Sequence, residues 1–492
     1  MHCHRIRVDR HVRAAVMIYG MPTQSELVGR IWADIVAQER SPSPPWKAEK
    51  GLPNIIASES GKSLFISSQT AKDINAFAHI FHNSSPALKI AYGSKDVSDL
   101  VRRAFGSVLA QTDTDTPAEA ACANILKGVQ QYLHELISQP KPPMTYVFGC
   151  WLIRDEVVTE IRFGPVCYER RHLWLNRMRA DGHVSELISR RVRRHWEGKK
   201  LRPLKNHEDR WREKGLIEAI GKCPMVCTVE AKGMSADVGY DKAVLAAKLG
   251  MTAVSLLWER PSRALEGFGL LIDGSSLLQH YVVFGETGAM TYAQNRGHPV
   301  GSTWIIPEEW PDIWNDNAWL TAPVTEFLTS LLDPCSPASR PKVARTLLFA
   351  MWWLYEACRA EAPLMAAAKF GACLDTLAGG QSEDRIMRLL EGRLGSRADD
   401  PVTPDGRTTR AVIKAIYGAA RSQTLHGSNE RYDHDWRGTR DLAEHLIRMV
   451  FVEVLDWLAD HPDAPDLSGA IAERAAPNAS RQSVSPPHSG QK

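Results

Sequence analysis

The sequence predicts a multidomain α+β protein with a mostly helical amino-terminal region, a central α+β domain and an all-α helical bundle at the carboxyl end. The first observation is length, because 492 residues exceed what one ordinary core accommodates and two or three domains are expected. The second is that the spacing of apolar residues changes twice along the chain, from helical steps to short β-branched runs and back. A hydrophobic content of 44% and a charged content of 24% are ordinary for a globular protein.

Residues 22–143 are expected to form the mostly helical region. ELVGRIWADIVAQ and AACANILKGVQQYLHELISQ place apolar residues at steps of three and four, which is typical of packed helices. LPNIIAS and KSLFISSQ lie between them and are interpreted as short strands, and SQPKPP at 138–143 is the expected joint to the next domain. Residues 1–21 are treated as an amino-terminal extension. Their short, ragged apolar stretch makes a poor signal peptide, and initiation at Met17 or Met21 explains them equally well.

Residues 144–335 are predicted to form the α+β domain. MTYVFGCWLI, VVTEIRFGPVCY and GFGLLIDG are short, rich in β-branched or aromatic residues, and closed by Gly, Asp or Pro, as strands are. YDKAVLAAKLGMTAVSLLWER is expected to be a packed helix, with an apolar stripe of Val244, Ala247, Met251, Val254 and Trp258. We expect this domain to sense a signal or to position the carboxyl-terminal domain.

Residues 336–462 are predicted to fold as a compact bundle, because five segments with helical spacing follow one another through short loops. One of them ends in Gly379–Gly380, and the next begins with a capping Ser382 and stops at Gly395. The last has an apolar stripe that needs partners to bury it, formed by Leu442, Leu446, Val450, Val454 and Leu458. Residues 463–492 are rich in Ala, Pro and Ser and are expected to be disordered.

Bulk charge and cysteine content narrow the possible function only a little. A formal net charge of +3 is close to neutral, so nucleic-acid binding requires local clusters of cations. Nine cysteines, without the spacing of a disulfide framework, indicate reduced thiols and a cytoplasmic location. No run approaches the ~20 apolar residues of a membrane span, so no membrane partner is expected.

Three local patterns offer weak candidate sites. SESGKS at 58–63 ends like a phosphate-binding loop, but that motif requires glycine where Ile56 stands, and a surface turn is favoured. Cys223 and Cys227 form C-x-x-x-C without a second ligand pair, so no zinc site is expected. YDHD at 432–435 offers metal-ligand types, but adjacent residues seldom converge on one ion, and a loop is favoured. We therefore expect neither a metal nor a cofactor.

The densest basic run is SRRVRRHWEGKKLRPLK at 189–205. A solvated helix face is the usual meaning of such a run. The alternative is phosphate binding, because several cations on one strip release counterions from a nucleic-acid backbone. The candidate nucleic-acid contacts are Arg190, Arg191, Arg193, Arg194, Lys199 and Lys200.

RSQTLHG at 421–427 ends the fourth helix of the expected bundle and carries the catalytic candidates, Arg421 and His426. The pattern R-x-x-x-x-H alone is not specific, since it also occurs at Arg190/His195, Arg202/His207 and Arg440/His445. At 421–427 it lies beside a mostly apolar helix face, and Gly427 stops the helix so that the histidine stands in its last turn. Helix carbonyl ends favour a protonated imidazole, and histidine suits acid–base work near neutral pH.

The geometry of an α-helix separates the two candidate side chains. Arg421 and His426 are expected about 140° apart around the axis and about 7.5 Å apart along it. One helix therefore aims them in different directions, whereas two such helices brought together gather both pairs around one phosphate.

The segment Y-x-x-x-R-S-x-x-L-H-G, from Tyr417 to Gly427, resembles the HEPN superfamily and specifically its ApeA-like branch. A motif that often precedes it in that family is matched by ACLDTL, with Asp375 in place of glutamate. EIRFGPVCYERRHLW of the central domain also looks like a strand region of large members of the branch. The resemblance covers the carboxyl-terminal bundle well and the central domain loosely, and residues 1–140 have no counterpart.

This resemblance implies a helical bundle that pairs with a second copy to form a homodimer, and a metal-independent endoribonuclease of bacterial toxin or anti-phage systems. His426 is then the general acid or base, Arg421 binds the scissile phosphate of the RNA substrate, and Tyr417 and Ser422 support them. Ser422 departs from the Asn, Asp or His of many active members. The alternative is a non-catalytic RNA-binding or dimerisation module, in which Arg421 is salt-bridged inside the bundle and His426 caps the helix.

Overall fold

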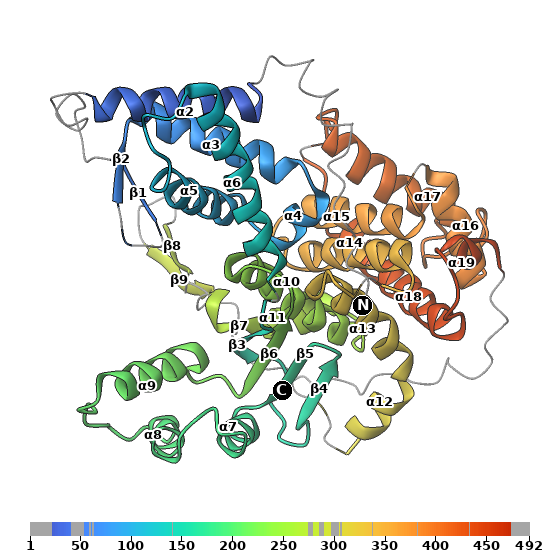
Figure 1. The fold of residues 1–492 in the computed structure, drawn as a ribbon. Helices are drawn as coiled ribbons and strands as arrows, with labels where there is room; N and C mark the ends of the chain where they lie inside the picture. Colours follow the sequence, from blue (N-terminus) through green and yellow to red (C-terminus); the bar gives the residue numbers. More distant parts are fainter. Residues whose placement is uncertain are drawn as a thin grey trace. The chain divides into compact units, whose positions relative to one another are not determined.

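The helical and strand segments expected from the sequence occur in the same order in the structure, a computed structural model shown in Figure 1. The structure describes residues 22–40, 54–58, 61, 63–139, 141–273, 279–284, 290–296, 305, 308–336, 338–380, 382–431 and 433–473. Contacts between residues divide the chain into two units. The first comprises Met1–Met144 and Lys232–Asp241, and the second Thr145–Ala231 and Lys242–Lys492. Helices predominate over small sheets, which confirms the α+β class.

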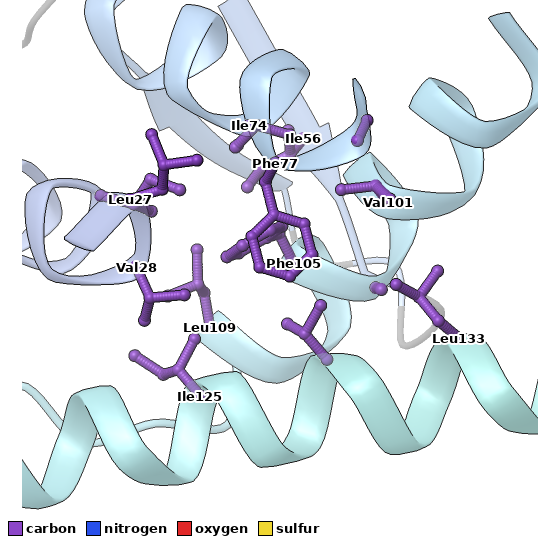
Figure 2. Close-up of a cluster of buried hydrophobic side chains, with 14 of the residues drawn as sticks. Leu27, Val28, Ile56, Ile74, Phe77, Val101, Phe105, Leu109, Ile125 and Leu133 are labelled. Atoms are coloured by element: carbon purple, nitrogen blue, oxygen red, sulfur yellow. The ribbon is translucent and has the colours of Figure 1, made fainter. Parts of the chain in front are cut away.

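The first unit is built from helices around an aromatic core. Its elements are α2 (Gln24–Glu39), β1 (Asn54–Ala57), β2 (Ser63–Ile66), α3 (Ser68–Asn83), α4 (Pro86–Ala91), α5 (Ser94–Leu109) and α6 (Ala118–Ser138). The two short strands, which their flanking Ser and Gly residues predicted, pair antiparallel. Phe77 of α3 and Phe105 of α5 meet edge to face, 5.2 Å apart between ring centroids, at the centre of the core in Figure 2. Burial of such rings stabilises the fold beyond the area that they remove from water.

A return segment also belongs to the first unit. Ser235 donates a hydrogen bond from its hydroxyl to Asp96 Oδ2 at 2.6 Å and another from its amide to Ala91 O at 2.8 Å. These bonds hold the stretch Lys232–Asp241, which the sequence analysis assigned to the central domain, against α4 and α5 of the first unit.

A five-stranded sheet lies in the second unit, apart from Met144 at its beginning. The strand order is β4-β5-β6-β3-β7, from β3 (Met144–Trp151), β4 (Glu160–Phe163), β5 (Val166–Arg170), β6 (Met225–Ala231) and β7 (Gly269–Leu270). β8 (Gln279–Phe284) and β9 (Met290–Arg296) form a separate antiparallel pair. The predicted packed helix is α10 (Ala236–Ser255), whose Ala247, Met251 and Val254 are buried. Tyr168 of β5 donates its hydroxyl hydrogen to the carbonyl of Ala247, so α10 packs on the sheet.

Helices α7 (Arg171–Ala180), α8 (Glu186–Trp196) and α9 (His207–Ile220) are inserted between β5 and β6. They enclose a small core of their own around Trp174, Leu175, Ile188 and Val192, which are nearly inaccessible to solvent. The basic run of the sequence forms α8 and the loop after it. α11 (Pro261–Gly267) and a 3-10 turn, η2 (Leu271–Asp273), complete this part.

The carboxyl-terminal helices are drawn in yellow to red in Figure 1. They are α12 (Trp310–Asp316), the 3-10 turn η3 (Ala318–Leu320), α13 (Thr321–Leu332), α14 (Pro341–Cys358), α15 (Pro363–Leu377), α16 (Glu383–Leu394), α17 (Thr409–Ile413), the π-helix η4 (Lys414–Gln423), α18 (Arg437–Asp460) and α19 (Ser468–Ala472). α15 packs against α14, η4 and α18. The apolar stripe of α18 is buried at Val450, Val454 and Leu458, as its need for partners predicted.

The predicted boundary at 335/336 does not separate two compact units. Buried Glu444 of α18 accepts hydrogen bonds from the amide and the hydroxyl of Ser262 at the start of α11. Arg359, directly after α14, donates to Leu265 O, and Arg448 of α18 donates to Leu256 O. The central domain and the bundle therefore share polar contacts and fall in one unit.

The expectation of disorder from residue 463 onward is wrong for its first part. Residues 463–473 are placed and include α19, which packs on α16. Leu467 and Ala470 are buried, and Glu473 accepts a hydrogen bond from Trp457 Nε1 at 2.9 Å. Composition suggested disorder, but these few contacts are sufficient to dock one helical turn. Residues 474–492 and 1–21 lie outside the described residues.

Across the ranges that the structure describes, no helix combines the length and apolar character needed to cross a membrane.

Candidate active site and a basic cleft

Arg421 stands on the π-helix η4, which follows the short α-helix α17 directly. A π-helix closes its hydrogen bonds over five residues instead of four, is rare, and occurs frequently at functional sites. The sequence predicted an ordinary α-helix here, so the angle of about 140° between Arg421 and His426 does not apply as calculated. The wider turn of a π-helix brings residues that are five positions apart closer to one face. η4 ends at Gln423, so this geometry covers only the first part of the interval from Arg421 to His426.

The Arg421 side chain is held between α15 and its own helix. Its Nη2 donates to Asp375 Oδ2 of α15 at 2.9 Å, and the two side chains are 24% and 13% exposed. Its guanidinium carbon lies 5.0 Å from the ring centroid of Tyr417, with Nη1 at 3.5 Å from the Tyr417 hydroxyl. Such a cation–π contact orients the planar guanidinium.

Gly371 explains how α15 and η4 approach so closely. A Cβ at this position would lie 2.9 Å from Arg421 Cβ and 3.1 Å from Ile416 O. No side chain fits there without moving the helices apart. The glycine is therefore part of the site, although it has no chemistry of its own.

The ion pair leaves hydrogen-bonding capacity unused. Arg421 Nε and Asp375 Oδ1 are both buried and have no hydrogen-bond partner. Burial raises the pKa of the Asp375 carboxyl above its usual range, although the neighbouring Arg421 guanidinium lowers it. Unsatisfied buried polar groups cost free energy, so this pair is poised to take a further polar partner.

His426 lies in the turn after the helix and is exposed. Its amide donates to Ser422 O at 3.0 Å, and Gly427 follows with a φ of 70°, the left-handed conformation predicted for the helix stop. Within the described residues the His426 imidazole makes no hydrogen bond or ion pair. Ser422 is half-buried and Leu425 is 58% exposed, so the helix end presents an imidazole and a leucine to solvent.

Neither Arg421 nor His426 lines the two hollows described next, which are formed by described parts of the chain. A cavity between α16 and α19 and a cleft beside α8 are both lined by other residues. Arg421 faces Asp375 within the bundle, as the non-catalytic alternative anticipated, whereas His426 faces solvent.

The predicted nucleic-acid contacts divide into tied and free cations. Arg191 forms an ion pair with buried Glu213 at 2.6 Å, Arg193 donates to Asn176, and Lys199 pairs with Glu197 at 2.5 Å. Arg190, Arg194 and Lys200 are exposed, and among the described residues they have no hydrogen bond or ion pair. Arg193 also keeps its charge, because Asn176 is a neutral amide, so four of the six cations form no ion pair in the described part of the chain.

A basic cleft of about 840 Å³ opens between the end of α8, the loop after it and α9. We define it by its lining residues Arg171, Trp196, Lys200, Arg202, Arg210, Ile217 and Lys222, together with the pairs Arg191–Glu213, Lys199–Glu197 and Lys214–Glu218. The sequence pattern located the cations of the run but not the cleft, because Arg171 and Lys222 come from other elements.

The weaker motifs give no second site in the described part of the chain. Cys223 and Cys227 are buried, and burial raises the pKa of Cys223 to about 12 and that of Cys227 well above its usual range, so both are thiols. No group of three or more His, Cys, Asp and Glu side chains in the described ranges is arranged to hold a metal. Lys62 and Tyr432 lie outside the described residues, and His434 packs edge to face on Trp436.

Asp375 is the site residue that the motif analysis did not assign a role. The motif ACLDTL marks Asp375 only as a replacement, and its separation of 46 residues from Arg421 hides the contact from any local pattern.

In comparisons with known proteins, no family model matches the chain, and no curated protein or solved structure matches it either.

Proposed function

We propose that the chain is a HEPN-type, metal-independent endoribonuclease whose homodimer brings two Arg421/His426 sets to one RNA phosphate. The observation that carries the proposal is the arrangement at the end of η4. Asp375 and Tyr417 orient the Arg421 guanidinium, and an exposed, unengaged imidazole follows five residues later. The resemblance of Tyr417–Gly427 to the ApeA-like branch supports it, as does the π-helix that carries Arg421.

The chemistry assigned to these residues balances without a metal. One His426 imidazole accepts the proton of the ribose 2′-hydroxyl while the 2′ oxygen forms a bond to phosphorus. The bond from phosphorus to the 5′ oxygen breaks, and a protonated imidazole of the second copy gives that oxygen its proton. Arg421 stabilises the charge that builds on the phosphate oxygens. The products are a cyclic phosphate and a free 5′-hydroxyl.

The dimer surface that we assign is the outer face of α14. Phe349, Trp352 and Trp353 are between 37% and 44% exposed there, and the rings of Phe349 and Trp352 stack on each other. Exposed aromatic side chains gathered on one helix are typical of a protein–protein interface.

The resemblance to the ApeA-like branch implies the cellular role that we propose, a cytoplasmic bacterial defence or toxin-like effector.

The deciding experiment is RNA cleavage in EDTA by the full chain and by His426→Ala. General acid–base catalysis contributes about 10²–10⁴-fold, so we expect a loss of at least about a hundredfold. His445→Ala is the matched control, because His445 is also exposed and belongs to another R-x-x-x-x-H pair, on α18. Equal cleavage by wild type and His426→Ala contradicts the proposal, and so does an active protein that sediments as a strict monomer.

The second candidate function is a non-catalytic RNA-binding or dimerisation module. The ion pair between Arg421 and Asp375 favours it, since it gives the arginine a structural role. It predicts salt-sensitive RNA binding that is lost when Arg190, Arg191, Arg193 and Arg194 are neutralised and that is unaffected by His426→Ala.

A further inference from the structure

We propose that the basic cleft binds a small phosphorylated nucleotide, with its phosphates at Lys200, Arg202 and Lys222 and its base against Trp196 and Ile217. The site is separate from the end of η4, and the inference does not depend on ribonuclease activity.

The charges in the cleft do not cancel. Three carboxylates line it, and each is taken by one cation, in the pairs Arg191–Glu213, Lys199–Glu197 and Lys214–Glu218. Lys200, Arg202 and Lys222 have no carboxylate partner among the described residues, and all three are exposed. Three free cations around one concave surface attract a multiply charged anion.

Two further guanidinium groups border the same space without a carboxylate. Arg171 Nη1 donates to Cys223 O at 3.4 Å, and Arg210 Nε donates to Leu204 O at 3.1 Å. These backbone contacts fix the direction of each planar group but leave its charge in place. A phosphate that enters the cleft therefore meets oriented donors as well as exposed lysines.

An apolar wall distinguishes the cleft from a plain anion site. Trp196 and Ile217 are half-buried and pack on the core of α7–α9. The Arg171 guanidinium lies 4.9 Å from the Trp196 ring centroid, and Trp196 Nε1 is a buried donor without a hydrogen-bond partner. A flat heterocycle offers a surface that stacks on such a wall.

Size favours a nucleotide over a long RNA strand. Cavities of about 300–1,000 Å³ are typical of small-ligand sites, and this one measures about 840 Å³. The free cations of the outer helix face, Arg190 and Arg194, do not line it, so a phosphate backbone crossing α8 would follow a different path.

The test is isothermal titration calorimetry of the full chain in EDTA with ATP, GTP, CTP and UTP, and with inorganic tripolyphosphate and a single-stranded oligouridylate. We expect at least one nucleotide to bind more tightly than tripolyphosphate. The double variant Lys200→Glu/Lys222→Glu is expected to bind that nucleotide at least about tenfold more weakly, because two attractive charges become repulsive. Arg190→Glu with Arg194→Glu, an equal charge change on exposed residues outside the cleft, is expected to change it less than about twofold.

Trp196→Leu separates recognition of the base from attraction of charge. This variant is expected to bind the nucleotide more weakly and to bind tripolyphosphate with unchanged affinity. The proposal is overturned if no nucleotide binds to the wild type. It is also overturned if the two double variants weaken nucleotide binding equally, or if Trp196→Leu leaves nucleotide binding unchanged. Oligouridylate that binds more tightly than every nucleotide and is lost with Arg190→Glu/Arg194→Glu also overturns it, in favour of an RNA surface on α8.

Discussion

At the scale of single residues, burial outweighs charge at the Arg421–Asp375 pair. The pKa of Asp375 is raised by its burial, and the attraction of Arg421 offsets this only in part. A carboxyl with a higher pKa in the folded state holds its proton more tightly there than in the unfolded chain. The free energy of unfolding therefore falls as the pH rises from the unfolded pKa through the folded one.

We predict that Asp375→Asn gains stability relative to the wild type as the pH rises from about 4 to about 7, because the amide has no proton to lose. Urea unfolding midpoints across this range measure the difference. Asp405→Asn is the control, since the Thr403 hydroxyl and Arg407 lower the pKa of the exposed Asp405. A lowered pKa affects stability mainly below about pH 4, so this variant is expected to keep a nearly constant stability relative to the wild type across the range. The opposite result, a wild type that becomes more stable relative to Asp375→Asn as the pH rises, would show that the attraction of Arg421 outweighs the effect of burial.

At the scale of helices and strands, the ends that depend on local conformation could be predicted from the sequence. Gly395 and Gly427 adopt φ values of 67° and 70°, and both stop helices where the pattern placed the stop. Only glycine adopts this conformation without strain, so the residue type itself carries the information. Ser382 stands at the predicted N-cap but its side chain makes no capping hydrogen bond. The π-helix η4 was not predictable, because its spacing of apolar residues also fits an α-helix.

The start of α11 shows a helix end that only tertiary contacts explain. Glu444, 182 residues away, accepts from both donors of Ser262. We predict that Glu444→Gln lowers the free energy of unfolding by about 1–3 kcal/mol, because a side-chain amide cannot accept from both donors with the strength of a carboxylate. Asp441→Asn on the same helix is the control. Its contact with Arg260 spans 3.9 Å between half-exposed groups, and its loss is expected to cost less than about 1 kcal/mol.

At the scale of the whole molecule, the units defined by contacts differ from the domains that composition predicts. SQPKPP and the change to strand-like residues predict a domain boundary after residue 143, and the first of the two stretches that form the first unit ends at Met144. The boundary at 335/336 followed an equally clear change from strands to helices. Composition reports local structure, whereas a unit is defined by what is buried across its parts. Composition does not reveal contacts such as the hydrogen bond from Arg359 to Leu265 O.

One substitution tests whether the central sheet and the bundle unfold together. A Cβ on Gly250 of α10 would collide with the Tyr168 hydroxyl in a fully buried contact, and overpacking of this kind costs about 1–3 kcal/mol. In Gly250→Ala we expect hydrogen exchange to accelerate by a similar factor in β5, α14 and α18, while α3 and α5 of the first unit keep their protection. Gly215→Ala on α9, where an added Cβ meets nothing within 4 Å, is expected to accelerate exchange in neither unit. Acceleration confined to β5 and α10 would mean that the bundle unfolds independently, as the composition of the chain first suggested.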